Sequence, residues 1–326
     1  MNVPELLKLS GAFWTTCTIH AGVKLDVFST LTQGAATAAE LAHALQTDVR
    51  GMGMLLNALT ALEFLEKNGE MFATTPFSSQ YLSKNSPDYM GHIIMHHHYL
   101  VEGWSKLDLA VTTGKPVRTS STYADDKVRK SFLMGMFNLA MQLAPHVARE
   151  IDLNGRKRLL DLAGGPGTYA IYFCKENPDL SAVIFDYPTT RPFAENTVAH
   201  FDLSDRIAFA AGDITVDAID TGFDVVWMSH LLHSKGPEAC RAIVAKAASA
   251  LEPGGILLIQ DFLLDDSRTA PLHSALFSLN MLIGTLEGQA YSQKEITEMM
   301  QQAGLHTIHR LAITLPNGAG IMAGTK

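Results

Sequence analysis

The stretch Arg158-Leu-Leu-Asp-Leu-Ala-Gly-Gly-Pro-Gly-Thr168 decides the fold of this chain of 326 residues. Its first half is an apolar run of the length of a buried strand, and the glycines that follow predict a tight turn. From Thr168 onward the pattern predicts a helix. A glycine turn lets the backbone approach a ligand closely, and the N-terminus of the next helix offers free N–H groups. The junction therefore predicts a site for a nucleotide-like ligand.

The glycine pattern by itself leaves two cofactors open. Gly165, Gly167 and Ala170 satisfy the G-x-G-x-x-A form of the dinucleotide fingerprint. NAD and S-adenosylmethionine are both compatible with that spacing. The choice between them depends on the residues around the turn.

Three successive predicted strands each carry an acid. Asp161 lies inside the first strand, where its carboxylate can either meet the ammonium of an amino-acid ligand or cap the glycine turn. Asp186 ends the strand Ser181–Asp186, a position suited to the two hydroxyls of a ribose. Asp213 follows the strand that begins at Arg206. A ligand with an ammonium, a ribose and an adenine fits the three acids, and this favours S-adenosylmethionine.

At this point the chain resembles the class I S-adenosylmethionine-dependent methyltransferases, specifically the two-domain small-molecule O-methyltransferases of plant phenolic, hydroxyindole and bacterial antibiotic pathways. The resemblance covers nearly the whole chain. Its carriers are Leu160–Gly167, Asp186, Gly212-Asp213, Leu231-Leu-His233 ahead of Cys240, and Leu251-Glu-Pro-Gly-Gly255. It implies an α/β fold with a Rossmann-like seven-stranded methyltransferase domain, and a cofactor site made by Asp161, Gly164, Gly165, Gly167, Asp186, Gly212, Asp213, Ile214 and Ser229.

Composition and charge argue against several other classes of protein. The net charge is −8, which argues against a broad nucleic-acid surface because phosphate binding needs clustered Lys and Arg. No apolar run reaches the roughly 18 residues of a membrane span, and the first residues lack the order of a secretory signal. The three widely spaced cysteines indicate neither a disulfide framework nor a zinc site. We expect a cytoplasmic protein.

Residues 1–85 are expected to form short helices followed by a hairpin at Asn68-Gly69, an arrangement like a winged helix. DNA binding is the obvious hypothesis for such a domain. However, residues 1–113 hold six Lys or Arg against ten Asp or Glu. The resemblance instead implies a dimerisation domain, and hence a homodimer.

Residues 86–150 are expected to be a helical connector. It carries the run His96-His97-His98, and only His92 and His96 share a helix face. A metal pair would need a third ligand that the sequence does not identify, so we predict no metal site. The resemblance implies that the connector covers the acceptor pocket, with His96, Met136, Phe137, Met141 and Asn280 as candidate pocket residues.

Residues 151–326 are expected to form the catalytic domain. Strands and helices alternate there at short spacing, which implies a parallel sheet with right-handed crossovers. Near the end, Ile308–Leu315 and Gly320–Thr325 flank Pro316-Asn-Gly318 and predict a hairpin. A terminal antiparallel hairpin matches the methyltransferase topology and counts against NAD.

His233 is the candidate general base, because it follows the fourth strand at the edge where α/β proteins bind ligands and imidazole titrates near neutral pH. The alternative is a histidine that caps the strand end. Two departures from the family pattern bear on the acceptor. Ser234-Lys235 stands where Asp-Trp is frequent, and Ala290 stands where an acid is frequent. Glu287 is the acid that we expect to orient His233.

The favoured function is S-adenosylmethionine-dependent O-methylation of a small hydroxylated metabolite. Methylation of sulfur or nitrogen on the same scaffold, or a reaction that uses the cofactor without transferring methyl, is the alternative. A DNA-binding module comes last.

Overall fold

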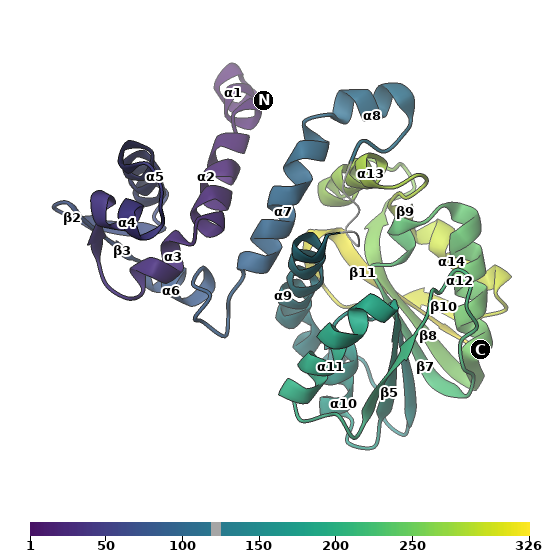
Figure 1. Ribbon diagram of the computed structural model, residues 1–326. Helices are drawn as coiled ribbons and strands as arrows, with labels where there is room; N and C mark the ends of the chain where they lie inside the picture. The colour runs from purple at the N-terminus through teal and green to yellow at the C-terminus, as the bar shows by residue number, and fades with distance from the viewer. Residues whose placement is uncertain (119–124) are drawn as a thin grey trace. The chain divides into compact units, whose positions relative to one another are not determined.

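The computed structural model describes residues 1–118 and 125–326. Contacts divide the chain into two compact units (Figure 1). One unit combines Met1–Val101 with Asp126–Asn138, and the other combines Glu102–Asp125 with Leu139–Lys326. The long helix α9 (Asp126–Glu150) contributes its first half to one unit and its second half to the other.

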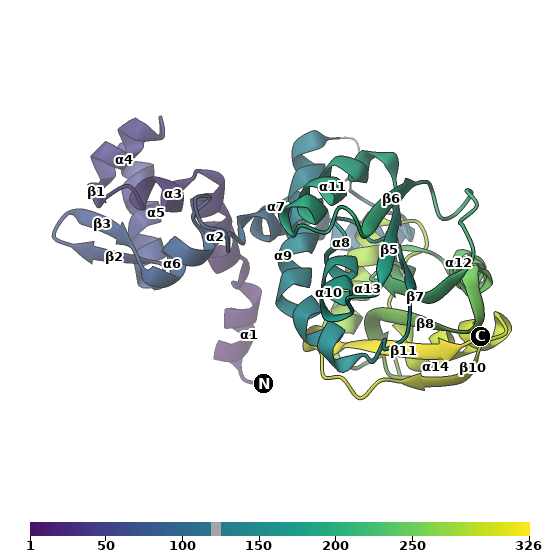
Figure 2. The same cartoon turned by 90° about the horizontal axis from the view of Figure 1, so that it is seen from below.

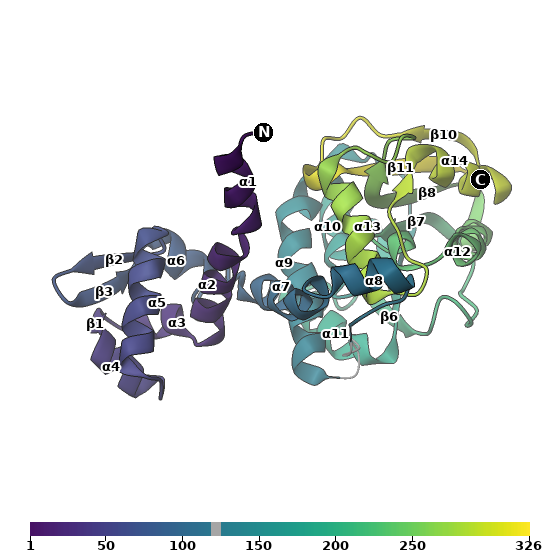
Figure 3. The ribbon, with the colours of Figure 1, turned by 90° about the horizontal axis from the view of Figure 1, so that it is seen from above.

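The first unit is mostly helical, with one small antiparallel sheet of order β1-β3-β2. The predicted hairpin is confirmed, because β2 and β3 pair on either side of the turn at Gly69. Figure 3 shows this hairpin beside α5, whose buried residues belong to the core of the unit. The elements are α1 (Val3–Ser10), α2 (Phe13–Lys24), α3 (Val27–Leu31), β1 (Ala36–Thr37), α4 (Ala38–Ala44), α5 (Val49–Ala61), β2 (Leu65–Asn68), β3 (Met71–Thr74), α6 (Pro76–Tyr81) and most of α7 (Gly91–Trp104).

The second unit is built on a sheet of order β10-β11-β8-β7-β4-β5-β6, with β9 paired to β8 beside that path. The five strands β6, β5, β4, β7 and β8 are parallel, and the hairpin β10–β11 joins β8 in antiparallel pairing. The strands are β4 (Arg158–Leu162), β5 (Ser181–Asp186), β6 (Ile207–Ala211), β7 (Phe223–Ser229), β8 (Leu251–Leu264), β9 (Tyr291–Ser292), β10 (His306–Arg310) and β11 (Ala319–Thr325).

Helices cover both faces of this sheet (Figure 2). The second half of α9, with α10 (Thr168–Glu176) and α11 (Arg191–His200), shares one apolar core with the sheet. On the other face, α12 (Pro237–Ala250) and α14 (Gln293–Gln302) share a second core. Helices α8 (Leu107–Thr113) and α13 (Leu272–Gly284) pack against each other. No helix of the described residues is both long and apolar enough to cross a membrane.

The predicted α/β fold is confirmed, including the terminal antiparallel hairpin. The first strand of that hairpin, β10, ends at Arg310, whereas the sequence predicted a strand that continues to Leu315. The strand order reverses at β4, because β5 and β6 lie on one side of it and β7 and β8 lie on the other. Ligands bind at such a reversal, beyond the carboxyl ends of the strands. The residues that follow β4, β5, β6 and β7 therefore surround the candidate site.

Candidate active site

Two of the three glycines in the turn between β4 and α10 lie close against neighbouring side chains. A Cβ on Gly167 would lie 2.3 Å from Cδ1 of Ile184, and the residue has a φ of +78°. A Cβ on Gly164 would lie 2.5 Å from the carboxyl carbon of Asp161. Glycine is thus required at both positions, by close approach and, at Gly167, by backbone conformation as well.

Asp161 lies beneath this turn and is 1% exposed. Its Oδ2 accepts a hydrogen bond of 3.2 Å from the backbone N–H of Ala170, in the first turn of α10. Asp161 therefore caps the first turn of α10, whereas the alternative from the sequence had it cap the glycine turn itself. Burial raises the pKa of Asp161 to about 7, despite that hydrogen bond. An ammonium group placed beside this carboxyl would restore its ionised form.

Asp186, at the end of β5, is joined to the glycine turn. Its Oδ2 accepts from the N–H of Gly165 at 2.8 Å, and its Oδ1 accepts from the Thr190 hydroxyl at 2.9 Å. Burial raises the pKa of this carboxyl above its usual value. The two strand-end acids and the turn thus form one connected structure.

Gly212 and Asp213 follow β6. A Cβ on Gly212 would lie 2.4 Å from Cζ of Phe185, so this backbone also passes close to its neighbour. Burial tends to raise the pKa of Asp213, but hydrogen bonds from Thr215 and the charge of Lys235 lower it below its usual value. Ile214, next in the chain, is buried.

The polar groups at these strand ends fit a cofactor with an ammonium, a ribose and an adenine. Ser229 ends β7 and pairs in register with Gln260 of β8. The side chains of Ser229 and Gln260 are turned toward the buried hydroxyl of Tyr169, with which both interact.

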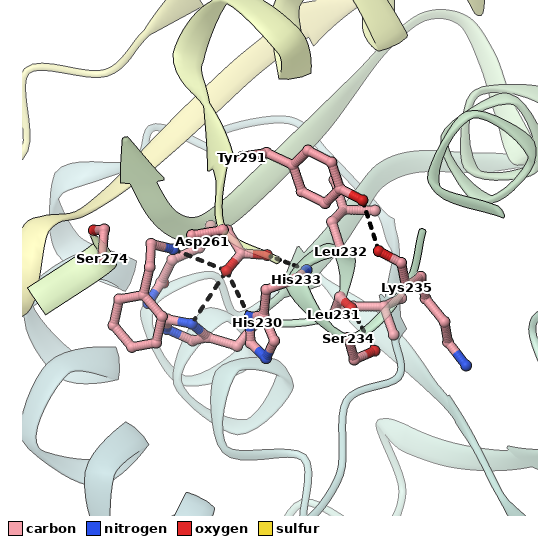
Figure 4. Close-up of polar contacts among 12 residues, drawn as sticks. His230, Leu231, Leu232, His233, Ser234, Lys235, Asp261, Ser274 and Tyr291 are labelled. Carbon is pink, nitrogen blue, oxygen red and sulfur yellow. Dashed lines mark hydrogen bonds and ion pairs between the residues drawn. The ribbon is translucent and has the colours of Figure 1, made fainter. Parts of the chain in front are cut away.

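The second half of the site is a buried histidine and carboxylate. His233 lies in the 3-10 turn η2 (Leu232–Ser234) directly after β7, and Asp261 lies in the adjacent strand β8. Nδ1 of His233 is 2.7 Å from Oδ1 of Asp261, and the backbone N–H of His233 donates to Oδ2 at 3.2 Å. Figure 4 shows the imidazole turned toward this carboxylate.

Asp261 is held in its ionised form. Burial tends to raise the pKa of this carboxyl, but the neighbouring imidazoles, His233 foremost, lower it well below its usual range. A backbone N–H from Phe262 adds a hydrogen bond of 2.8 Å. A negative charge therefore faces Nδ1 of His233.

The loop that carries His233 is held by side chains from neighbouring elements. The hydroxyl of Tyr291 donates to the carbonyl of Lys235 at 2.6 Å (Figure 4), and the thiol of Cys240 contacts the carbonyl of Leu232 at 3.2 Å. The ring of Phe277, in α13, meets the His233 ring edge-on at 4.7 Å between centroids. The imidazole thus has a defined orientation beside an aromatic wall.

The acid beside His233 is Asp261, whereas the sequence analysis named Glu287. Glu287 is exposed and makes no hydrogen bond to His233 among those of the described residues. Asp261 went unnoticed because it lies inside β8, 28 residues after His233. One signal was available, since Gln260 and Asp261 interrupt the apolar run Ile256–Leu264, much as Asp161 interrupts the apolar run of β4.

The candidate pocket residues are divided between the two units. His96, Met136 and Phe137 are partly buried residues of the first unit, and the His96 ring lies 5.3 Å from the Phe132 ring. Met141 and Asn280 belong to the second unit, where Oδ1 of Asn280 accepts from Nε1 of Trp104 at 3.1 Å.

Comparison with protein families identifies the class of protein. The O-methyltransferase domain model matches residues 104–306, and the O-methyltransferase dimerisation domain model matches residues 7–84. The chain belongs to the O-methyltransferase family. It is an S-adenosylmethionine-dependent methyltransferase, as the sequence predicted.

Individual relatives cover nearly the whole chain. It is 32% identical to the 3-hydroxy-5-methyl-1-naphthoate 3-O-methyltransferase of Streptomyces sahachiroi, over 99% of this chain and 95% of that protein. It is 29% identical to a tetracenomycin polyketide synthesis 8-O-methyltransferase of Streptomyces glaucescens, over 97% and 95%. The solved structure of an O-methyltransferase family protein from Burkholderia thailandensis aligns with a TM-score of 0.89 at 30% identity, covering 100% of this chain and 98% of that one.

Proposed function

We propose that this enzyme methylates a hydroxyl group on a small aromatic metabolite, with His233 as general base and Asp261 as the residue that positions it. The observation that carries the proposal is the short contact between His233 Nδ1 and Asp261 Oδ1. A carboxylate on Nδ1 fixes the tautomer in which Nε2 lacks a proton and can accept one.

The bound cofactor supplies an electrophilic methyl group on its sulfonium. The chain has two tasks in the transfer. Asp161, Asp186 and Asp213, with the glycine turn, hold the ammonium, ribose and adenine ends. Nε2 of His233 takes the hydroxyl proton as the acceptor oxygen becomes a nucleophile, and Asp261 stabilises the resulting imidazolium. Removal of that proton by a positioned base contributes about 10² to 10⁴ in rate.

An aromatic acceptor is supported by the rings beside the base. Phe262 and Phe277 lie 4.5 Å apart between centroids, and Phe277 also contacts the His233 ring. A flat ring can stack on such a wall with its hydroxyl directed at the imidazole. The naphthoate named for the Streptomyces sahachiroi relative is an acceptor of this kind.

We propose the following division of the chain. Residues 1–85 form a winged-helix-like domain that holds two copies together as a homodimer. Residues 86–150 line the acceptor pocket with His96, Met136, Phe137 and Met141. Residues 151–326 bind the cofactor and contribute Asn280 to the pocket. A cytoplasmic location remains a prediction from the sequence.

The test is incubation with methyl-labelled cofactor and a panel of matched aromatic phenols, thiols and amines. We expect label on the phenols, and we expect phenols whose hydroxyl is blocked to remain unlabelled. Transfer to thiols or amines with none to the phenols would contradict the proposal.

A further inference from the structure

The sequence offered no third metal ligand for His92 and His96, but within the described part of the chain the fold brings together a different set of three, around the proposed base His233. His230, His233 and Asp261 come from the end of β7, from η2 and from β8. Their ligand atoms all lie within 4.8 Å of one another. Figure 4 shows both imidazoles converging on the carboxylate of Asp261.

His230 is arranged differently from an ordinary surface histidine. Its Nδ1 is buried without a hydrogen-bond partner among the described residues, and lies 3.7 Å from Oδ1 of Asp261, beyond hydrogen-bond range. Its other ring nitrogen, Nε2, is 3.1 Å from the amide nitrogen of Gln260. A metal-binding histidine donates its second ring N–H to an oxygen acceptor, while its first nitrogen binds the ion. The Gln260 amide supplies that acceptor when it is turned so that Oε1, which has no hydrogen-bond partner among the described residues, faces Nε2.

The backbone at His230 supports the same orientation. Its N–H donates to the carbonyl of Gln260 at 2.8 Å, and its φ is +52°, a conformation that non-glycine residues adopt with strain. The ring also packs on Phe262 at 4.6 Å between centroids. The chain thus holds an unpartnered imidazole nitrogen next to a carboxylate that already contacts a second imidazole.

We propose that His230, His233 and Asp261 bind a divalent transition-metal ion of the zinc class, and that this ion inhibits the enzyme. Two imidazoles and one carboxylate suit Zn²⁺ and its neighbours, whereas Ca²⁺ and Mg²⁺ require more oxygen ligands. Ligand atoms on a tetrahedral ion with bonds of about 2.1 Å lie about 3.4 Å apart. The observed separations approach this geometry within small side-chain movements.

The inhibition follows from where the proton must go, and it rests on the proposed role of His233. The ion would replace the proton of Nδ1 in the contact with Asp261. A neutral imidazole that is metallated at Nδ1 carries its remaining proton on Nε2. That nitrogen can then no longer accept the proton of the acceptor hydroxyl. Metal binding and base catalysis therefore exclude each other.

The test uses untagged, chelator-treated full-length protein, because a histidine tag would bind the probe. Co²⁺ is titrated as the spectroscopic probe, and its visible absorption is recorded for wild type, His230→Asn and His273→Asn. Asparagine tolerates a positive φ, so His230→Asn preserves the local backbone. His273 is the matched control, because its ring lies against Phe262 at 4.8 Å but it is not one of the three ligands.

We expect one Co²⁺ per chain in wild type and in His273→Asn, and binding at least about tenfold weaker in His230→Asn. Absence of a site in wild type would overturn the proposal, as would equal binding in wild type and His230→Asn, or equal loss in both variants. Zn²⁺ should also block methyl transfer by wild type, with recovery on adding chelator. If Co²⁺ binds as expected but Zn²⁺ leaves turnover intact, the metal site is supported, and the inhibition and the base role of His233 fail.

Discussion

Nδ1 of His233 and Oδ1 of Asp261 lie 2.7 Å apart, although 28 residues separate them in the chain. The parallel pairing of β7 with β8 creates this contact, because Ser229 pairs with Gln260 one residue before the carboxylate. The carboxylate is buried, and it also accepts the backbone N–H of His233. The fold therefore sets both the position and the tautomer of the imidazole.

Replacing Asp261 with Asn should lower kcat by about 10² to 10⁴, because an amide can hold Nδ1 in the wrong tautomer. Glu287→Gln removes the exposed acid that the sequence favoured, and it should cost far less. Steady-state kinetics on the identified acceptor compare the two variants. A larger loss for Glu287→Gln than for Asp261→Asn would show that we have chosen the wrong carboxylate.

Binding of S-adenosylhomocysteine should tighten as pH rises toward the pKa of Asp161. Burial raises this pKa to about 7, so the folded protein holds the proton more tightly than the unfolded chain does between the ordinary value and about 7. In the ligand-free protein, the contribution of Asp161 to folding stability therefore decreases as pH rises through that window. A ligand ammonium favours the ionised carboxylate, so affinity should increase in the same window.

Calorimetry from about pH 5.5 to about pH 7.5 checks this, below the range where an α-amino group loses its proton. The variant Asp161→Asn cannot titrate, so its affinity should be weaker and nearly flat with pH. A wild-type affinity that is independent of pH would contradict the contact between Asp161 and the ammonium.

Gly167→Ala should destabilise the catalytic unit more than Gly155→Ala. The two glycines have φ values of +78° and +77°, so both substitutions incur the same backbone strain of about 1 to 2 kcal/mol. Only Gly167 would place its Cβ against Ile184, whereas Gly155 has open space, and overpacking adds about 1 to 3 kcal/mol. Urea unfolding measures the difference. Equal losses would mean that the turn has room for a side chain.

The exposed apolar side chains of α1 should lie in the dimer interface. None of its residues is buried, and Leu6, Leu7 and Leu9 are each more than half exposed. The double variant Leu6→Lys, Leu9→Lys should shift sedimentation velocity profiles toward monomer, because buried charge opposes association. Glu70→Lys, on the hairpin turn, is the control for added charge. A wild type that sediments as a monomer at micromolar concentration would contradict the homodimer.

The sequence predicted the strands and the glycine turn that carry the proposed cofactor residues, because apolar runs and glycines can be recognised locally in the chain. Asp161 lies within the first predicted strand of the catalytic domain, the glycine turn follows that strand directly, and Asp186 ends the next strand along the chain. Asp261 could not be found in the same way, since its role depends on which strands are neighbours. His230 was missed for a related reason, because its unpartnered nitrogen becomes evident only when Asp261 and Gln260 are placed beside it.

Turnover by His233→Asn tests whether His233 removes the proton of the acceptor hydroxyl. We predict that kcat on the true acceptor falls by about 10² to 10⁴ while the affinity for S-adenosylhomocysteine stays within about twofold of wild type. The loss of activity at low pH that a histidine base causes should disappear in the variant. Retention of more than about a tenth of wild-type turnover, measured with labelled cofactor under saturating conditions, would contradict the general-base role of His233.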